Sequence, residues 1–251
     1  MSLKEKRMTR TLTGFDEQLR AITREQTRIA VADGQMDAYG AAPGTDKGPG
    51  VIVVTHVFGI DQDMKDVCDE LAARGCVALA PNFFWRDQDS GVLAEATDVQ
   101  RAIGRAMRID FPKSMDELRR SIEALKRHPR CNGKVVLLGY CFGGPYAWRA
   151  ACDGLGVDAS VSFHGTYVSK YLKPGDKPSC PVAFHYGERD HLAPAEELAA
   201  VKAVADANGC SFVVHPDAGH AYMMPANSHY HPEAARKSWD AALQLIATLQ
   251  A

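Results

Sequence analysis

The sequence lacks any apolar run long enough to cross a bilayer. Apolar stretches such as residues 51–54 and 135–138 span only a few positions, whereas a transmembrane helix needs about 20. The chain also has no stripe of lysine and arginine interleaved with aromatic residues, and its formal net charge is only -2. Nucleic-acid binding requires such a basic footprint. We therefore expect neither a membrane nor a nucleic acid as a partner.

Disulfide and metal signatures are missing as well. The seven cysteines are an odd number without a Cys-x-x-Cys pair. No apolar run follows the basic residues near the N-terminus, so we expect neither secretion nor a disulfide framework. The only close histidine pair in the sequence, His229 and His231, is a weak metal signal. These absences predict a cytoplasmic protein that uses no metal and no other cofactor.

The sequence does contain an alternation of short β-like runs with segments of helical period. This pattern is typical of an α/β fold, in which a mostly parallel sheet carries helices on both faces. Residues 28–34 and 36–43 predict an antiparallel N-terminal hairpin with a tight turn at Asp33-Gly34.

No linker or low-complexity segment divides the chain. We therefore expect a single domain over residues 28–251, preceded by an extension over residues 1–27. The stretch from Arg86 to Phe111 is long for a plain connection, and its apolar residues recur with helical spacing. It should form cap-like helices above the sheet edge, with Arg86 near any site there.

One segment has the shape of a nucleophile elbow. The strand over residues 134–140 runs directly into Cys141, and a helix of small residues follows Gly144. Hydrolases of the α/β class present their nucleophile on such a sharp strand-to-helix turn, usually with Ser. The start of a helix favours a thiolate. The alternative is a buried structural cysteine that precedes a glycine-rich helix start.

Two further residues follow the elbow in the order that α/β-hydrolases use for their catalytic triad. Asp190 comes after the strand over residues 181–187, and His220 lies after the next strand, which gives the order nucleophile, acid, base. Separately, Asp190 could cap the helix that begins near Pro194, and His220 could be a surface histidine. Together they favour a Cys-His-Asp triad.

At these residues the sequence resembles the dienelactone hydrolase family, whose Cys-His-Asp members open an enol-lactone of catechol degradation routes. The resemblance covers the chain from about Arg28 onward. It rests on the elbow Gly-Tyr-Cys-Phe-Gly-Gly and on four further segments: 55-THVFG-59, 81-PNFFWR-86, 187-GERDHLAP-194 and 217-DAGH-220. The resemblance implies an α/β-hydrolase fold.

The resemblance also implies a role for each site residue. Cys141 would attack the acyl carbon, while His220 would act as general base and Asp190 would hold the imidazole tautomer. The backbone N–H groups of Phe142 and Val57 would form the oxyanion hole. No cofactor is needed for such a hydrolysis.

Two positions depart from the family pattern. The family usually has Glu just before the position of Val57, hydrogen-bonded to the resting thiol, and here that residue is His56. Dienelactone-specific members bind the substrate carboxylate with two arginines. Arg86 matches one of them, but Met224 stands at the other position. A single arginine holds a carboxylate less well than a pair, so we expect substrates other than true dienelactone.

The sequence therefore predicts a cysteine-dependent hydrolase that cleaves a small ester or lactone through a thioester. His56 either accepts the thiol proton or hydrogen-bonds locally at the strand end. The apolar flank of the substrate pocket is expected from residues that could equally belong to the core: Phe84, Trp85, Tyr222 and Met224. The alternative function is a non-hydrolytic binding or redox-sensing protein with Cys141 as its activated thiol.

Overall fold

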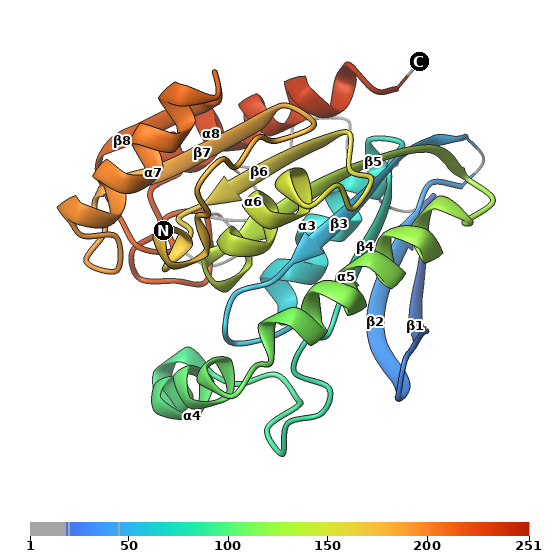
Figure 1. The fold of residues 1–251 in the computed structure, drawn as a ribbon. Helices are drawn as coiled ribbons and strands as arrows, with labels where there is room; N and C mark the ends of the chain where they lie inside the picture. Colours follow the sequence, from blue (N-terminus) through green and yellow to red (C-terminus); the bar gives the residue numbers. More distant parts are fainter. Residues whose placement is uncertain (1–18, 20, 45, 251) are drawn as a thin grey trace. The chain divides into compact units, whose positions relative to one another are not determined.

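The computed structural model describes residues 19, 21–44 and 46–250 (Figure 1). The described part of the chain divides into two compact units, which we call the N-terminal unit (from residue 19 to Val136, with Gln250) and the C-terminal unit (Leu137–Leu249). Most of the expected extension over residues 1–27 lies outside the described residues. Its last part does not, because the first strand begins at Thr23, five residues before the predicted start of the domain.

Four strands and three helices lie wholly within the described part of the N-terminal unit. They are β1 (Thr23–Val31), β2 (Gly34–Ala42), β3 (Gly48–Val54), α3 (Gln62–Ala73), β4 (Val77–Pro81), α4 (Glu95–Met107) and α5 (Phe111–Lys126). The strand order is β1-β2-β4-β3, with β1 and β2 antiparallel and β3 and β4 parallel. This confirms the predicted edge hairpin, although Val31 pairs with Gly34 and the turn therefore falls one residue earlier than expected.

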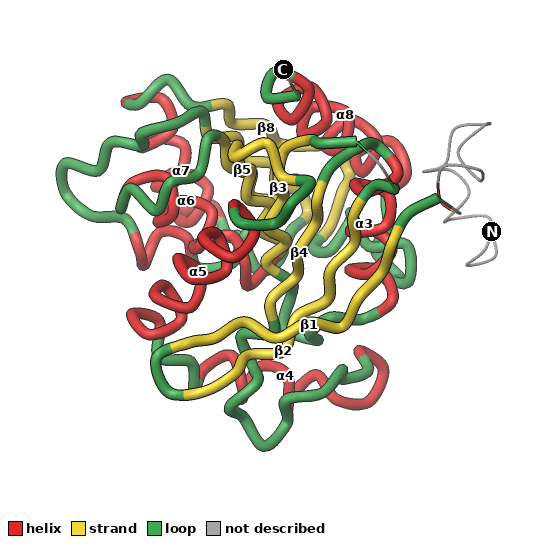
Figure 2. The backbone as a smooth tube through the Cα atoms, turned by 90° about the vertical axis from the view of Figure 1, so that its right-hand side faces the viewer, coloured by secondary structure: helices red, strands yellow, loops and turns green. Residues whose placement is uncertain are grey.

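Local signals in the sequence set the ends of α3. The side chain of Asp61 accepts a hydrogen bond from the Met64 N–H at 3.0 Å and so caps the helix. Beyond the other end, Gly75 has a φ of +86°, which glycine adopts without strain. The apolar face of α3 packs on β2 and β4, and α5 covers the opposite face of these strands (Figure 2).

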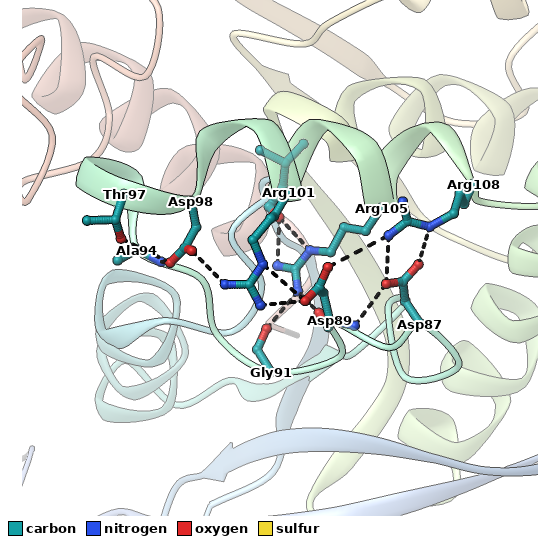
Figure 3. Close-up of polar contacts among 10 residues, drawn as sticks. Asp87, Asp89, Gly91, Ala94, Thr97, Asp98, Arg101, Arg105 and Arg108 are labelled. Atoms are coloured by element: carbon teal, nitrogen blue, oxygen red, sulfur yellow. Dashed lines mark hydrogen bonds and ion pairs between the residues drawn. The ribbon is translucent and has the colours of Figure 1, made fainter.

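The segment between β4 and α5 contains one helix, α4, with non-helical backbone at Asp98. Its anchor is Arg105, which is 0% exposed. The Arg105 guanidinium donates from Nε and Nη2 to the Val57 carbonyl at 2.9 and 2.6 Å, and from Nη1 to the carbonyls of Asp89 and Gly91 (Figure 3). One buried charge therefore fixes α4, the loop before it and the loop after β3.

Exposed ion pairs hold the same helix at two further points. Arg101 pairs with Asp89 and Asp98, and Arg108 pairs with Asp87 (Figure 3). The arginine side chains are 55% and 50% exposed, so each pair contributes little stability by itself. On another face of α4, Val99, Ile103 and Met107 lie exposed at helical spacing.

The C-terminal unit continues from β5 (Cys131–Tyr140), which begins in the N-terminal unit. It contains η1 (Cys141–Gly143), α6 (Gly144–Cys152), β6 (Ala159–Phe163), η2 (Val168–Tyr171), β7 (Val182–Arg189), α7 (Ala195–Ala207), β8 (Ser211–Gly219) and α8 (Pro232–Ala247). The order is β5-β6-β7-β8, with β6, β7 and β8 parallel. Helices α6 and α8 cover opposite faces (Figure 2). None of the described helices is both long and apolar enough to cross a bilayer.

A chain of hydrogen-bonded polar side chains runs through the core of the C-terminal unit. His185 Nδ1 lies 3.2 Å from His215 Nε2, and the two rings are stacked. His215 Nε2 lies 2.8 Å from Ser238 Oγ, which is 2.8 Å from the Tyr222 hydroxyl. Burial, followed by the charge of His215, lowers the pKa of His185 to about 4. The folded protein therefore holds this imidazole in its neutral form at neutral pH.

This buried pair should make the fold sensitive to acid. A histidine whose pKa is lowered on folding contributes its full stability above the unfolded pKa of about 6.5. That contribution is lost as the pH falls toward 4, and it amounts to about 3 kcal/mol. We expect the unfolding free energy of His185→Phe, measured by urea denaturation, to fall less between pH 7.5 and 4.5 than that of the wild type. The exposed His229→Gln provides the control, and equal pH dependence in all three proteins would contradict this account.

Candidate active site

The predicted nucleophile lies where β5 ends and the chain turns into α6. Cys141 is 6% exposed and has a φ of 51°, a left-handed conformation that residues other than glycine adopt only at a cost. A side chain at Gly139 would collide with the Gly143 carbonyl. The glycine at 139 is therefore required for the strand to approach the turn this closely, which explains the glycine-rich motif.

The structure brings the three predicted triad residues into one hydrogen-bonded chain within the C-terminal unit. His220 Nε2 lies 3.2 Å from the Cys141 sulfur, and His220 Nδ1 lies 3.0 and 2.9 Å from the two carboxylate oxygens of Asp190. His220 is 9% exposed, so it is not a surface histidine. Asp190 does not cap α7, because its carboxylate accepts from the Leu192 N–H at 2.9 Å and α7 begins without a side-chain cap.

The charges in this chain favour an ion pair at rest. Burial alone would lower the pKa of His220, but the negative charge of Cys141 and the hydrogen bonds with Asp190 and Cys141 outweigh it and raise the pKa to about 10. The imidazole therefore favours its protonated form at neutral pH, which places a positive charge beside the Cys141 sulfur and would stabilise a thiolate there. A thiolate is the nucleophilic form of cysteine.

A third histidine, His164, belongs to this cluster although the sequence did not point to it. It is fully buried directly after β6, with a φ of 40°, and its N–H donates to the His185 carbonyl at 2.7 Å. Its ring meets the His220 ring edge-on, with centroids 5.0 Å apart. The sequence feature that could have identified His164 is its position directly after a buried strand, because the carboxyl ends of parallel strands gather at one edge of a sheet.

These side chains also form the one group among the described residues with the geometry of a metal site. Ligand atoms of Cys141, His164 and His220 all lie within 4.8 Å of one another. Thiolate sulfur and imidazole nitrogen are the ligands that Zn²⁺ prefers. The weak pair noted in the sequence, His229 and His231, is not part of this group.

The loop after β3 carries two of the other predicted site residues, and local bonds fix it within the N-terminal unit. Val57 accepts from Arg105 through its carbonyl. His56 Nδ1 accepts from the Phe58 N–H at 3.2 Å, and His56 Nε2 lies 3.3 Å from an Asp61 carboxylate oxygen. With Nδ1 accepting and Nε2 facing a carboxylate, the ring has no lone pair left for a thiol proton. This geometry favours the alternative in which His56 hydrogen-bonds locally at the strand end, and not the one in which it accepts the thiol proton.

Arg86, the predicted carboxylate binder, is already paired with two carboxylates. Its guanidinium bonds to Asp33 in the β1–β2 turn and to the buried Glu117 of α5, and it stacks 4.1 Å from the centroid of the Trp85 ring. Trp85 itself donates from Nε1 to Glu117 at 3.1 Å. Arg86 therefore ties the edge hairpin to a helix, and its positive charge is already balanced.

The remaining predicted pocket residues differ in exposure. Tyr222 and Met224 are 0% and 3% exposed, and the hydroxyl of Tyr222 is bonded to Ser238. Both therefore pack in the core of the C-terminal unit. The N–H of Phe142 is the other predicted oxyanion donor. Phe142 lies in η1 directly after the nucleophile and is only partly buried.

Comparison with known proteins agrees with this arrangement. Residues 36–250 match the model of the dienelactone hydrolase family. A carboxymethylenebutenolidase of a Pseudomonas species is 28% identical over 223 residues, which is 88% of this chain and 93% of that protein. The carboxymethylenebutenolidase of Pseudomonas putida is 28% identical over 212 residues, covering 83% and 89%.

Two solved structures are similar over nearly the whole chain. A candidate dienelactone hydrolase from Klebsiella pneumoniae subsp. pneumoniae has a TM-score of 0.79 and 26% identity, covering 90% of this chain and 99% of that chain. A dienelactone hydrolase-like promiscuous phosphotriesterase from metagenomic libraries has a TM-score of 0.77 and 25% identity, covering 92% and 100%.

The sheet, the strand-to-helix turn and the Cys-His-Asp arrangement define a hydrolase of the α/β-hydrolase fold. The family match over residues 36–250 narrows this class further. The chain belongs to the dienelactone hydrolase family, as its motifs predicted.

The ion pair predicts how the thiol should react with alkylating agents as the pH changes. Because His220 keeps its proton up to a pKa of about 10, alkylation of Cys141 by iodoacetamide should change less than about threefold between about pH 6 and 8. An ordinary thiol, with a pKa of about 8.5, would react roughly tenfold faster with each pH unit. Peptide mapping measures both rates, with Cys152 as internal control because burial raises its pKa to about 12. A steep rise at Cys141 would contradict the ion pair.

Proposed function

We propose that this protein hydrolyses small neutral esters or lactones through a thioester at Cys141. The observation that carries the proposal is the hydrogen-bonded chain from Asp190 through His220 to the Cys141 sulfur. The dienelactone hydrolase family supports the reaction class, since a lactone is a cyclic ester.

In the first half-reaction the Cys141 thiolate attacks the acyl carbon, and the carbonyl electrons move onto oxygen. The N–H groups of Phe142 and Val57 are the proposed donors to this oxyanion. When the oxyanion collapses, the C–O bond to the leaving group breaks and the His220 imidazolium gives it a proton. A thioester and a neutral imidazole remain, and a lactone would keep its alcohol on the same molecule.

In the second half-reaction the neutral His220 takes a proton from water, and the resulting hydroxide adds to the thioester carbonyl. Collapse breaks the C–S bond, which releases the acid and regenerates the thiolate beside the imidazolium. Asp190 keeps the Nδ1 proton of His220 in place through both halves, so Nε2 always faces the reacting atoms.

The preference for neutral substrates rests on the charges around Arg86. Binding a substrate carboxylate there would require Arg86 to exchange an existing partner, Asp33 or the buried Glu117. Releasing Glu117, whose side chain is 3% exposed, would leave a buried negative charge unpaired. The position of the family's second arginine is the buried Met224.

Replacing the nucleophile provides the direct test. Cys141→Ala should keep less than about a hundredth of wild-type kcat/KM on activated esters, because binding and an oxyanion hole alone leave little catalysis. The half-buried Cys152→Ala is the matched control and should stay near wild type. Mass spectrometry should find the acyl group on Cys141 after rapid quenching. Acylation without turnover would instead favour the alternative, a thiol-based sensor.

The proposed substrate class is tested with pairs of esters that differ only by a carboxylate. The wild type should hydrolyse the neutral member with a kcat/KM at least equal to that of the acidic one. Arg86→Gln should change the ratio of the two values by less than about threefold, because a paired arginine adds little attraction for an anion. A loss of more than about tenfold on the acidic ester alone would show that Arg86 binds carboxylates.

A further inference from the structure

We infer that Cys141, His164 and His220 form a binding site for one Zn²⁺ ion that reversibly inhibits the enzyme. The ligand atoms of the three side chains lie within 4.8 Å of one another, and all three residues are buried. In a tetrahedral site, Zn–S bonds of about 2.3 Å and Zn–N bonds of about 2.0 Å place the ligand atoms about 3.5 Å apart. The side chains therefore need only small rotations to enclose the ion.

The backbone already holds two of the ligands in place. Cys141 and His164 both have left-handed backbone conformations, with φ values of 51° and 40°. The Thr166 N–H donates to the Cys141 carbonyl at 3.1 Å, which links the two turns, and the His164 N–H is bonded to the His185 carbonyl. Little conformational freedom remains to be lost when the ion binds.

The third ligand, His220, is hydrogen-bonded to a carboxylate, as metal-binding histidines commonly are. His220 gives Nδ1 to the Asp190 carboxylate and directs Nε2 at the Cys141 sulfur. A carboxylate behind the histidine fixes the tautomer and raises the basicity of the ligand nitrogen. Three protein ligands also leave a fourth position for water, as in zinc sites that are not purely structural.

Inhibition follows from the electron pairs that the ion would occupy, and this step rests on the proposed function. Zinc would bind a lone pair of the Cys141 sulfur and the Nε2 lone pair of His220, and the proton that these two groups share at rest would pass to solvent. The sulfur could then not attack an acyl carbon, and His220 could not transfer a proton. A chelator that removes the ion would restore both groups.

The experiment titrates the full-length protein with ZnCl₂ in chelator-buffered solution and follows both binding and ester hydrolysis. Loss of a residue that only hydrogen-bonds to a metal ligand weakens metal binding by about 10- to 100-fold. His164→Asn removes a direct ligand, so it should weaken zinc affinity by at least about tenfold. His191→Asn is the matched control. His191 also lies near His220, with ring centroids 6.2 Å apart, but it is exposed and outside the ligand group. Its zinc affinity should equal that of the wild type.

Cobalt provides a readout that is independent of activity. Wild type loaded with Co²⁺ should show a thiolate-to-cobalt charge-transfer band, and Cys141→Ser should lose it. If His164→Asn fails to fold, as judged by circular dichroism, His164→Gln replaces it. Inhibition is compared as the fraction of each variant's own zinc-free activity.

The outcomes separate this inference from the proposed function. Equal zinc affinity in wild type and His164→Asn, or a cobalt spectrum that survives in Cys141→Ser, would overturn the zinc site while ester hydrolysis stands. A zinc site that behaves as expected in a protein that hydrolyses no ester would instead overturn the proposed function.

Discussion

The site depends on one backbone constraint, the reversal from β5 into α6 at Cys141. A φ of 51° at a non-glycine residue is tolerated only because the surrounding chain enforces it. The enforcement comes from close approach, since Gly139 has no side chain to collide with the Gly143 carbonyl. The Thr166 N–H also holds the Cys141 carbonyl. Relaxing this turn would move the sulfur away from His220, and the ion pair would be lost.

Two buried charged groups, one in each unit, are satisfied in different ways, and each solution matches a different task. In the C-terminal unit, the His220 imidazole lies between the Asp190 carboxylate and the Cys141 sulfur, and each of these groups is able to exchange a proton. In the N-terminal unit, Arg105 is satisfied by backbone carbonyls alone. Carbonyls cannot take a proton from a guanidinium, so this charge serves only to hold the loops.

Local patterns predicted much of the fold and the catalytic chain. The edge hairpin and the glycine-rich elbow follow from residues close together in sequence, and the order of Asp190 and His220 follows from the alternation of strands and helices. His164 was missed because its place beside the nucleophile arises from strand neighbours far apart in the chain. The Arg86 pairs were missed for the same reason, since its partner Glu117 lies on a separate helix.

Helix α4 is held by exposed ion pairs and by the buried hydrogen bonds of Arg105, and ionic strength affects these two kinds of contact differently. The pairs of Arg101 and Arg108 are about half exposed, and the Debye length shrinks from about 10 Å at 0.1 M salt to about 3 Å at 1 M. The bonds of the fully buried Arg105 are much less screened. In concentrated brine the helix would therefore stay held at its last turn, where Arg105 lies, while the ion pairs of Arg101 and Arg108 weaken.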